Sequence, residues 1–312
     1  MKIRDDVIGA DHFSASAQRI VDYLNAHTAI PDWSVSRVSG GEQVHVHVHE
    51  DTFLSVGQRV PWDETMCRRM YDGGSNLVPD VQADPVYADH AFAGIVRAYA
   101  GIPITDDEGN IFGTLCGVGT VPLDGLDAVD IDLIALMGQL LSSQLAMARS
   151  SDRDRRTTDI TTALAHTDAL TGLVNRRGWD LFVGDAQQRV DAYADPVAVA
   201  VIDLDGLKAV NDADGHQAGD ELLRRTGDAL RAVEQPIDRI ARYGGDEFAI
   251  LSNNIAQSDL ASHFGRFVDS LAEQGVSASM GYAATNPGLV SLAEAFAAAD
   301  TAMYATKTAK RS

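Results

Sequence analysis

The sequence predicts an α+β protein of two domains joined by a helix. Its 312 residues exceed the usual size of a single domain. Up to about residue 125, helical segments mix with alternating, strand-like stretches that break at turn clusters, as in an antiparallel sheet. Residues 168–312 instead alternate helix-like and strand-like segments, which is typical of one central sheet flanked by helices.

Composition places the chain among globular proteins, with 45% hydrophobic and 22% charged residues. The formal net charge is −20, with 9 Lys/Arg against 21 Asp/Glu in residues 1–150 and 16 against 24 in the remainder. Such a surface repels a phosphate backbone, so we expect no nucleic-acid partner, although a small polyphosphate can bind through a screening cation. We find no signal peptide and no apolar run of membrane-spanning length, and we expect a cytoplasmic protein without a membrane partner.

The first domain is predicted to contain two helices, a strand and a hairpin, at 12–27, 61–74, 44–50 and 99–120. In the first helix, apolar residues recur at helical spacing: Phe13, Ile20, Tyr23 and Leu24. The hairpin turns at the cluster DDEGN. These elements predict a mixed domain around an antiparallel sheet.

Residues 127–167 predict a helical linker that overlaps the last helix of the first domain. The stretch contains no proline, and its apolar residues recur at helical spacing: Leu133, Met137, Leu140 or Leu141, Leu145, Ile160 and Leu164. Its middle, RSSDRDRRTT, is almost wholly polar. Two interpretations stay open, a solvated linker helix and a dimer-forming stalk that passes signals between domains.

Two pairs of carboxylates stand out in the second domain. Asp203 and Asp205 end the apolar run PVAVAVIDLD, which is typical of a strand buried on both faces. Asp246 and Glu247 lie at the tip of a predicted hairpin, between RIARY and FAILS. If strand and hairpin are neighbours, Asp203 and Asp246 converge, and their mutual repulsion requires a cation between them. Oxygen ligands of this kind suit Mg²⁺.

Polar residues follow the first carboxylate pair. Gly206 lets the backbone approach a phosphate, and Lys208 can pair with that phosphate as a point charge. Asn211, His216 and Asp220 are spread over a loop and a helix start. The Asp220 carboxylate can accept the two parallel donors of guanine, or it can cap the helix, and spacing alone favours the cap.

Together these segments resemble the GGDEF family of diguanylate cyclases over residues 166–312. The resemblance rests on five ordered blocks, DALTGLVNRRGW, DLDGLKAVNDADGHQAGD, RYGGDEF, SASMGYA and ADTAMYATK. It implies a cyclase- or polymerase-palm-like fold and a homodimer that condenses two GTP molecules into cyclic di-GMP and two pyrophosphates. Each 3′-hydroxyl attacks the other α-phosphate, so positioning and charge stabilisation dominate and no protein nucleophile is needed.

The resemblance also implies residue roles. Asp203 and Asp246 bind Mg²⁺ or Mn²⁺ through their carboxylates, and Leu204 does so through its carbonyl. Asp246 also takes the 3′-hydroxyl proton and forms the catalytic group with Glu247 and Lys208. The other implied roles are guanine recognition by Asn211 and Asp220, a nucleotide-site position at His216, phosphate contacts by Lys208, Lys307 and Arg311, and structural roles for Asp168, Asn175 and Arg176.

The chain departs from the family pattern at a product-binding Arg-x-x-Asp motif. Gln235 stands where the Arg is usual, while Asp238 is kept. Because glutamine lacks the bidentate contacts of a guanidinium, we expect weak product inhibition. Leu207 replaces a usual Phe, and Lys310 replaces a common Gly beside Arg311. The alternative function is a catalytically silent nucleotide-binding receptor or scaffold, which the intact Asp203 and Asp246 oppose.

The first domain resembles a GAF domain, on the segments VPWDETMCRRM, LVPDVQADPVYADH and YAGIPITDDEGNIFGTLCGV. GAF domains act as small-molecule sensors or dimerisation modules. The resemblance therefore implies regulation and homodimer contacts through this domain and the linker helix, with the ligand unassigned. The predicted boundaries are 1–148 for this domain, 127–167 for the linker and 168–312 for the cyclase domain.

Side chains of the first domain offer three hints about a ligand. His45, His47 and His49 share one face of a strand, which fits metal or haem-iron ligation, but a solvated sheet face is favoured. Cys67 and Cys116 form a redox pair if their helix and strand touch, although buried inert thiols are favoured. Trp62 is expected to serve local packing.

Overall fold

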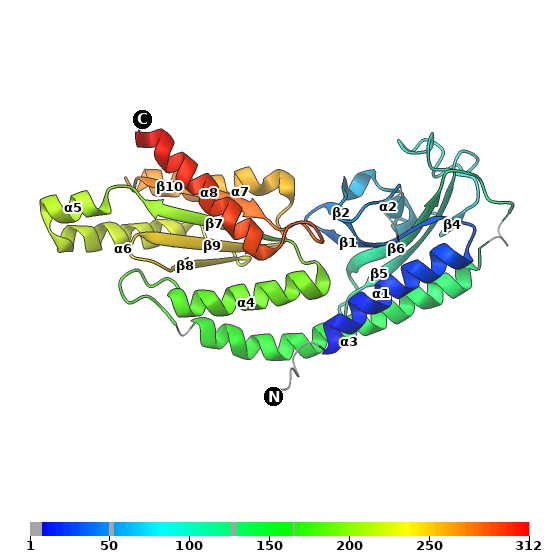
Figure 1. Cartoon of the computed structure of the whole chain (residues 1–312), viewed down its shortest axis with the longest axis horizontal. Helices are drawn as coiled ribbons and strands as arrows, with labels where there is room; N and C mark the ends of the chain where they lie inside the picture. The colour runs from blue at the N-terminus through cyan, green and yellow to red at the C-terminus, as the bar shows by residue number, and fades with distance from the viewer. Residues whose placement is uncertain (1–7, 50–52, 126–128, 165, 312) are drawn as a thin grey trace. The chain divides into compact units, whose positions relative to one another are not determined.

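The computed structural model describes residues 8–49, 53–125, 129–164 and 166–311, with the side chains described except in 8–12, 151–164 and 311. The chain divides into two compact units, with the division between Arg153 and Asp154 and with the short segments 192–194 and 287–289 counted in the first unit. Both units mix helices with antiparallel sheets, which confirms the predicted α+β class (Figure 1).

The first unit is built on a six-stranded antiparallel sheet in the order β3-β2-β1-β6-β5-β4. Its strands are β1 (Asp32–Ser39), β2 (Glu42–Val48), β3 (Arg59–Pro61), β4 (Leu77–Val78), β5 (Ala98–Thr105) and β6 (Ile111–Gly119). A two-residue turn joins β1 to β2, and its Gly40 and Gly41 have φ of 59° and 75°, which glycine adopts without strain. The predicted hairpin over 99–120 is the pair β5–β6.

Helices cover one face of this sheet. α1 (Ile8–His27) and α3 (Ile131–Leu164) contribute Phe13, Val21, Leu24, Leu141 and Leu145 to one core with the sheet. The opposite face is covered by a short helical turn η1 (Trp62–Glu64), by α2 (Met66–Tyr71) and by the segment before β5. Trp62 is buried in this second core, in line with a packing role.

The register of α3 corrects the predicted apolar stripe. Leu141 and Leu145 of the predicted stripe are buried, together with Ile134, which was not part of it, whereas Leu133 and the alternative Leu140 are exposed. The difference arises because α3 carries two apolar stripes, and only one faces the sheet. The side chains of Ile160 and Leu164 lie outside the described residues.

The same helix corrects a second expectation, that no apolar run is long enough to cross a membrane. Ile131–Ser150 has the length and mean hydropathy of a membrane span, because leucines, alanines and methionines dominate its composition. Length and composition are weak evidence here, since the helix also packs Ile134, Leu141 and Leu145 into the core of the first unit and a core helix passes the same test.

The three histidines do not lie together on a solvated face. His45 is 4% exposed and its Nδ1 contacts Ser34 Oγ at 2.8 Å, while His49 is exposed beside Asp22. Segment 53–60 causes the difference, because backbone hydrogen bonds between it and His45 fold it over the middle of β2. Among the described residues, no group of three His, Cys, Asp or Glu side chains is placed to hold a metal.

The second unit has a four-stranded antiparallel sheet in the order β10-β7-β9-β8. Its elements are α4 (Arg176–Tyr193), β7 (Val197–Leu204), α5 (Leu207–Asp214), α6 (His216–Ala232), β8 (Asp238–Arg242), β9 (Glu247–Asn253), η3 (Gln257–Asp259), α7 (Leu260–Glu273), β10 (Ala278–Ala284) and α8 (Leu292–Arg311).

Strand β7 is buried along its whole length, as its continuous apolar run predicts. Ala198, Ala200 and Ile202 pack with α6 and α7, and the alternate residues Val197, Val199 and Val201 pack with α4 and α8. Such runs are usual in parallel sheets. Here the sheet is antiparallel, and the run is explained by helices on both faces.

Candidate active site

The centre of the site is the end of β7 beside the β8–β9 hairpin. Asp203 pairs with Glu247 in the β7–β9 register, and the next amide, Leu204 N–H, donates to the carbonyl of Asp246 at 3.0 Å. The adjacent strands therefore bring Asp203 beside Asp246 and Glu247, as the sequence analysis anticipated for Asp203 and Asp246. Asp203 and Leu204 are buried, while Asp246 and Glu247 are half-buried.

The tip of the hairpin depends on its two glycines. A Cβ on Gly244 would lie 2.2 Å from Glu247 Oε2, so no larger residue fits without moving that carboxylate. A Cβ on Gly245 would meet nothing within 4 Å, so this side of the turn is open. Gly244 is needed because the Glu247 side chain lies against it, and Gly245 leaves space next to the carboxylates.

Arg242, which was not singled out in the sequence, stabilises the turn between β8 and β9 by donating hydrogen bonds to its backbone. Its Nη2 and Nε donate to the carbonyl of Gly245 at 2.7 and 3.1 Å, and its Nη1 contacts Asp168 Oδ1 at 3.2 Å. Burial alone would raise the pKa of Asp168, but hydrogen bonds from Thr171 and Arg242 lower it below the usual value. A structural role was expected for Asp168. Its ion pair with Arg242 holds the guanidinium against the turn between β8 and β9. The signal for this pairing is absent from local sequence, because the two residues are 74 positions apart.

Helix α8 brings two lysines to the carboxylates of β7. Lys307 Nζ contacts Asp203 Oδ1, and Lys310 Nζ contacts Asp205 Oδ2 at 3.0 Å. Burial would raise the pKa of Asp205, whereas hydrogen bonds from Lys310, Ser277 and Ser279 lower it below its usual value. Lys310, a departure from the family pattern, is therefore an ion-pair partner at the edge of the site. Arg311 ends α8, but its side chain lies outside the described residues.

The predicted guanine-binding residues come from α5 and α6. Gly206 precedes α5 with φ of 81°, and Gly215 precedes α6 with φ of 84°. Asn211 lies against Gly219, where a Cβ would be 1.9 Å from Asn211 Oδ1. Because Gly219 adjoins Asp220 in sequence, the structure places Asn211 close to the backbone that carries Asp220.

Asp220 is not the helix cap that spacing alone favoured. α6 begins at His216 after Gly215, so Asp220 is already in the second turn. His216 and Lys208 are exposed, and Lys208 forms no ion pair among the residues that the structure describes. The structure therefore groups Asp203, Leu204, Asp246, Glu247 and Lys307, with Asn211 and Asp220 as a second group.

The donor set fits a divalent cation. Carboxylates from Asp203 and Asp246 and the carbonyl of Leu204 are hard oxygen donors, which Mg²⁺ and Mn²⁺ prefer. Lys307 already neutralises part of this charge through Asp203. These residues are compatible with a metal site but, as a set of two carboxylates, they do not by themselves define one.

Asp238, the residual half of the Arg-x-x-Asp motif, is fully buried at the start of β8. Its carboxylate oxygens contact Ser252, His263, Arg266 and the backbone N–H of Gln235. All of these partners come from the same unit. The carboxylate is therefore committed to internal contacts.

Comparison with known proteins identifies the class. Residues 165–312 match the family described as "Diguanylate cyclase, GGDEF domain". The chain is 28% identical over 264 residues to diguanylate cyclase DgcP of Escherichia coli, covering 81% of this chain and 76% of that protein. It is 34% identical over 191 residues to an uncharacterised protein encoded in the hutH 5′ region of Streptomyces griseus, covering 59% of this chain and 76% of that protein.

A solved GGDEF domain, that of DgcB from Caulobacter crescentus in complex with c-di-GMP, is 31% identical, with a TM-score of 0.44 and coverage of 46% of this chain and 91% of the other. The family match carries the assignment. Residues 165–312 belong to the GGDEF family. The second unit of the chain is a diguanylate cyclase GGDEF domain, which confirms that part of the predicted resemblance.

Proposed function

We propose that this chain is an active diguanylate cyclase, which condenses two GTP molecules into cyclic di-GMP and two pyrophosphates. The observation that carries the proposal is the meeting of Asp203 with Asp246 and Glu247 where β7 adjoins the β8–β9 hairpin. This meeting lies in the domain that matches the cyclase family.

Asp203, Asp246 and the carbonyl of Leu204 would hold Mg²⁺ or Mn²⁺, which supplies positive charge to the triphosphate when bound. Asp246 accepts the proton of the attacking 3′-hydroxyl, and Glu247 supports the turn through its contact with Gly244. Lys307 is paired with Asp203 and must exchange this partner for a phosphate oxygen when substrate enters. Lys208, exposed on the first turn of α5, and Arg311 contact the remaining phosphates.

Guanine is read by Asn211 and Asp220, with His216 at the edge of the nucleotide site. The Asp220 carboxylate accepts from the ring N–H and the exocyclic amine of guanine, and adenine presents an acceptor where the ring N–H would be. The structural support is the packing of Asn211 across Gly219, next to Asp220. GTP is therefore preferred to ATP.

Catalysis requires a homodimer, because each protomer holds one GTP and supplies half of the product. The first unit, as a GAF-type regulatory domain, and α3 mediate this pairing. On α3, Leu133, Leu136, Leu140 and Met147 are exposed, and their spacing of three, four and seven residues is that of a coiled-coil seam. A cytoplasmic location belongs to the proposal, since GTP is a cytoplasmic nucleotide.

Product inhibition through the Arg-x-x-Asp motif is weak. Gln235 cannot form the bidentate contacts of an arginine, and the Asp238 carboxylate is already committed to Arg266 and His263.

The test is pyrophosphate release from GTP by full-length protein and three variants. Asp203→Asn and Asp246→Asn keep the side-chain shape and are expected to lower turnover at least a hundredfold, as loss of a charged transition-state contact does. Asp269→Asn, on the exposed face of α7, is the matched control and should retain activity. GTP binding without turnover in the wild-type dimer would instead establish the silent receptor.

A further inference from the structure

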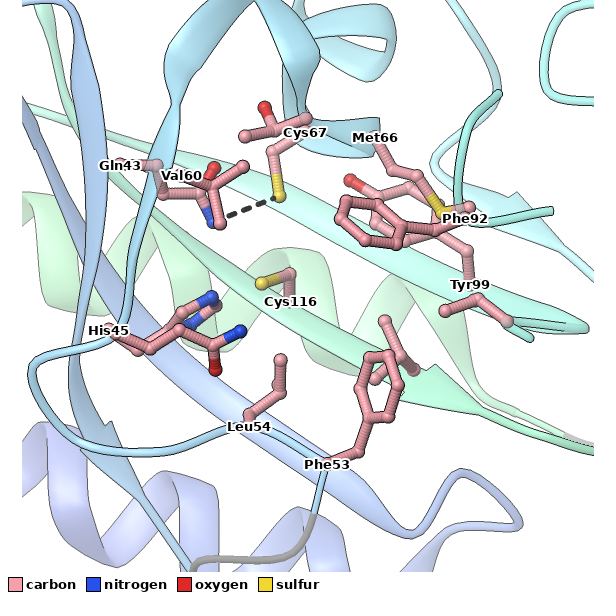
Figure 2. Close-up of a pocket in the computed structure, with 14 residues that line it drawn as sticks. Gln43, His45, Phe53, Leu54, Val60, Met66, Cys67, Phe92, Tyr99 and Cys116 are labelled. Carbon is pink, nitrogen blue, oxygen red and sulfur yellow. Dashed lines mark hydrogen bonds between the residues drawn. The ribbon is translucent and has the colours of Figure 1, made fainter. Parts of the chain in front are cut away.

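A cavity lies in the first unit, between the six-stranded sheet and the elements that cover its α2 side (Figure 2). Its cavity volume is about 80 Å³. The lining residues are Gln43, His45, Phe53, Leu54, Gln58, Val60, Thr65, Met66, Cys67, Phe92, Val96, Tyr99, Cys116 and Val118. None of these is Lys, Arg, Asp or Glu, and burial lowers the pKa of His45 to about 4, so apart from Cys67 the wall is uncharged near pH 7. A small neutral molecule therefore enters it more readily than an ion.

Both cysteines of the sequence line this cavity. Cys67 comes from α2 and Cys116 from β6, and they are 4% and 3% exposed. Both are free thiols that line the same cavity, and Thr114, two residues before Cys116 on β6, donates to Cys67 Sγ at 3.4 Å. Figure 2 shows the two sulfur atoms on the cavity side of their elements. The helix and the strand thus touch beside the two cysteines, and a redox pair between Cys67 and Cys116 requires such contact.

Hydroxyl groups contact both sulfur atoms, and Ser34 Oγ lies 3.4 Å from Cys116 Sγ. Cys67 Sγ accepts from Thr114 Oγ1 at 3.4 Å and from Gln43 Nε2 at 3.6 Å. The Cys116 thiol, with these donors, lowers the pKa of Cys67 to about 7, and the pKa of Cys116 is raised because Cys67 faces it. The donors at Cys67 Sγ favour its thiolate, which is the reactive form of a cysteine.

Two polar atoms on the same wall lack partners among the described residues. Gln43 Oε1 is a buried acceptor, and Tyr99 Oη is a buried hydroxyl beside the Cys67 thiol without a hydrogen bond of good geometry. Buried polar atoms are normally paired, so these two point to a small polar molecule next to Cys67. Hydrogen peroxide, which donates and accepts hydrogen bonds and carries no charge, matches both atoms.

We propose that Cys67 and Cys116 are a peroxide-reactive redox pair that closes reversibly to a disulfide between α2 and β6. Cys67 sulfur attacks one peroxide oxygen, the O–O bond breaks, and Cys67 becomes a sulfenic acid while the other oxygen leaves as water with the thiol proton. Cys116 sulfur then attacks the sulfenic sulfur, the S–O bond breaks, and a second water leaves with the Cys116 proton. Two thiols lose two electrons in total and one peroxide gains them. An external dithiol returns the electrons and reopens the pair.

The experiment uses full-length protein, reduced, treated with one equivalent of hydrogen peroxide and quenched with N-ethylmaleimide. Intact-mass analysis should show a monomer lighter by two hydrogens, without a maleimide adduct, and peptide mapping should join Cys67 to Cys116. Dithiothreitol should restore two maleimide adducts. Two adducts after peroxide, a disulfide between chains, or a sulfinic acid at Cys67 beside a free Cys116 would each overturn the proposal.

Two variants assign the roles of the sulfur atoms. Cys116→Ser should stop at a Cys67 sulfenic acid that dimedone captures, and Cys67→Ser should give no capture at Cys116. In reduced wild type at pH 7, iodoacetamide should alkylate Cys67 roughly tenfold faster than Cys116. Equal rates, or capture at Cys116, would contradict the assignment. The wild-type mass measurement decides the proposal even if a serine variant fails to fold.

Discussion

Replacement of Asp238 by alanine should destabilise the cyclase domain more than replacement of any surface carboxylate. Asp238 is fully buried, and its oxygens contact Ser252 Oγ at 2.7 Å, His263 Nε2 at 3.1 Å, the Gln235 N–H at 2.9 Å and the Arg266 guanidinium. Alanine removes all four contacts at once. It also leaves Arg266, a partly buried cation, without its carboxylate.

The magnitude follows from this loss of a buried partner. Removal of one member of a buried ion pair costs about 3–5 kcal/mol, because the other charge stays desolvated. The matched control is Asp228→Ala on α6, where the carboxylate is 74% exposed and pairs with Arg231 at 3.2 Å. An exposed pair of this kind contributes about 0–1 kcal/mol. The expected difference between the two variants is therefore at least about 2 kcal/mol.

Hydrogen exchange of the full-length chain, followed by mass spectrometry, measures this difference where it arises. Peptides from β8 and β9 should exchange on the order of a hundredfold faster in Asp238→Ala than in wild type, and Asp228→Ala should match wild type. Equal exchange in the two alanine variants would refute the reasoning that Asp238 organises this edge of the sheet. The result also bears on product inhibition, since Asp238→Ala is then unsuitable as a simple binding-site variant.

Three further predictions concern α8, the product motif and the first unit. Gly281→Ala on β10 would place a Cβ 2.1 Å from the Met303 backbone nitrogen, so α8 must shift. We expect the free energy of unfolding, measured in urea, to fall by about 1–3 kcal/mol and turnover to fall with it. The control Gly265→Ala has open space around the new Cβ and should not be destabilised. Gln235→Arg should strengthen inhibition by cyclic di-GMP at least tenfold in steady-state kinetics, and unchanged inhibition would remove Gln235 as the cause. Burial lowers the pKa of His45 to about 4, so below about pH 6.5 the unfolded chain binds a proton that the folded chain does not. The free energy of unfolding should therefore fall between pH 6.5 and pH 4. His45 contributes about 1.4 kcal/mol per pH unit to this fall, beside a similar contribution from His47, and His45→Gln should reduce the slope.

Elements of the cyclase domain were predictable where a short sequence pattern alone determines strand burial or turn geometry. The apolar run of β7 indicated burial on both faces, and the glycine-rich turn between RIARY and FAILS indicated a hairpin, and both are present. These signals are local, because strand burial and turn geometry are encoded within a few residues.

Other features depend on residues far apart in sequence. The two apolar stripes of α3 have similar composition, so spacing alone could not show that Ile134 faces the sheet and Leu133 does not. His45 was expected on a solvated face because nothing in its strand signals that segment 53–60 folds over it. Likewise, the contacts of Asp238 come from α7, 25 and 28 residues downstream.

The central claim is that the chain makes cyclic di-GMP from GTP. The most direct measurement is mass spectrometry of the product formed by full-length protein with Mg²⁺ and either GTP or ATP, beside Asp246→Asn. We predict cyclic di-GMP from the wild-type protein with GTP, none from the variant, and little cyclic dinucleotide from ATP. No cyclic di-GMP from a wild-type preparation that is dimeric and binds GTP, or equal product from Asp246→Asn, would contradict the account.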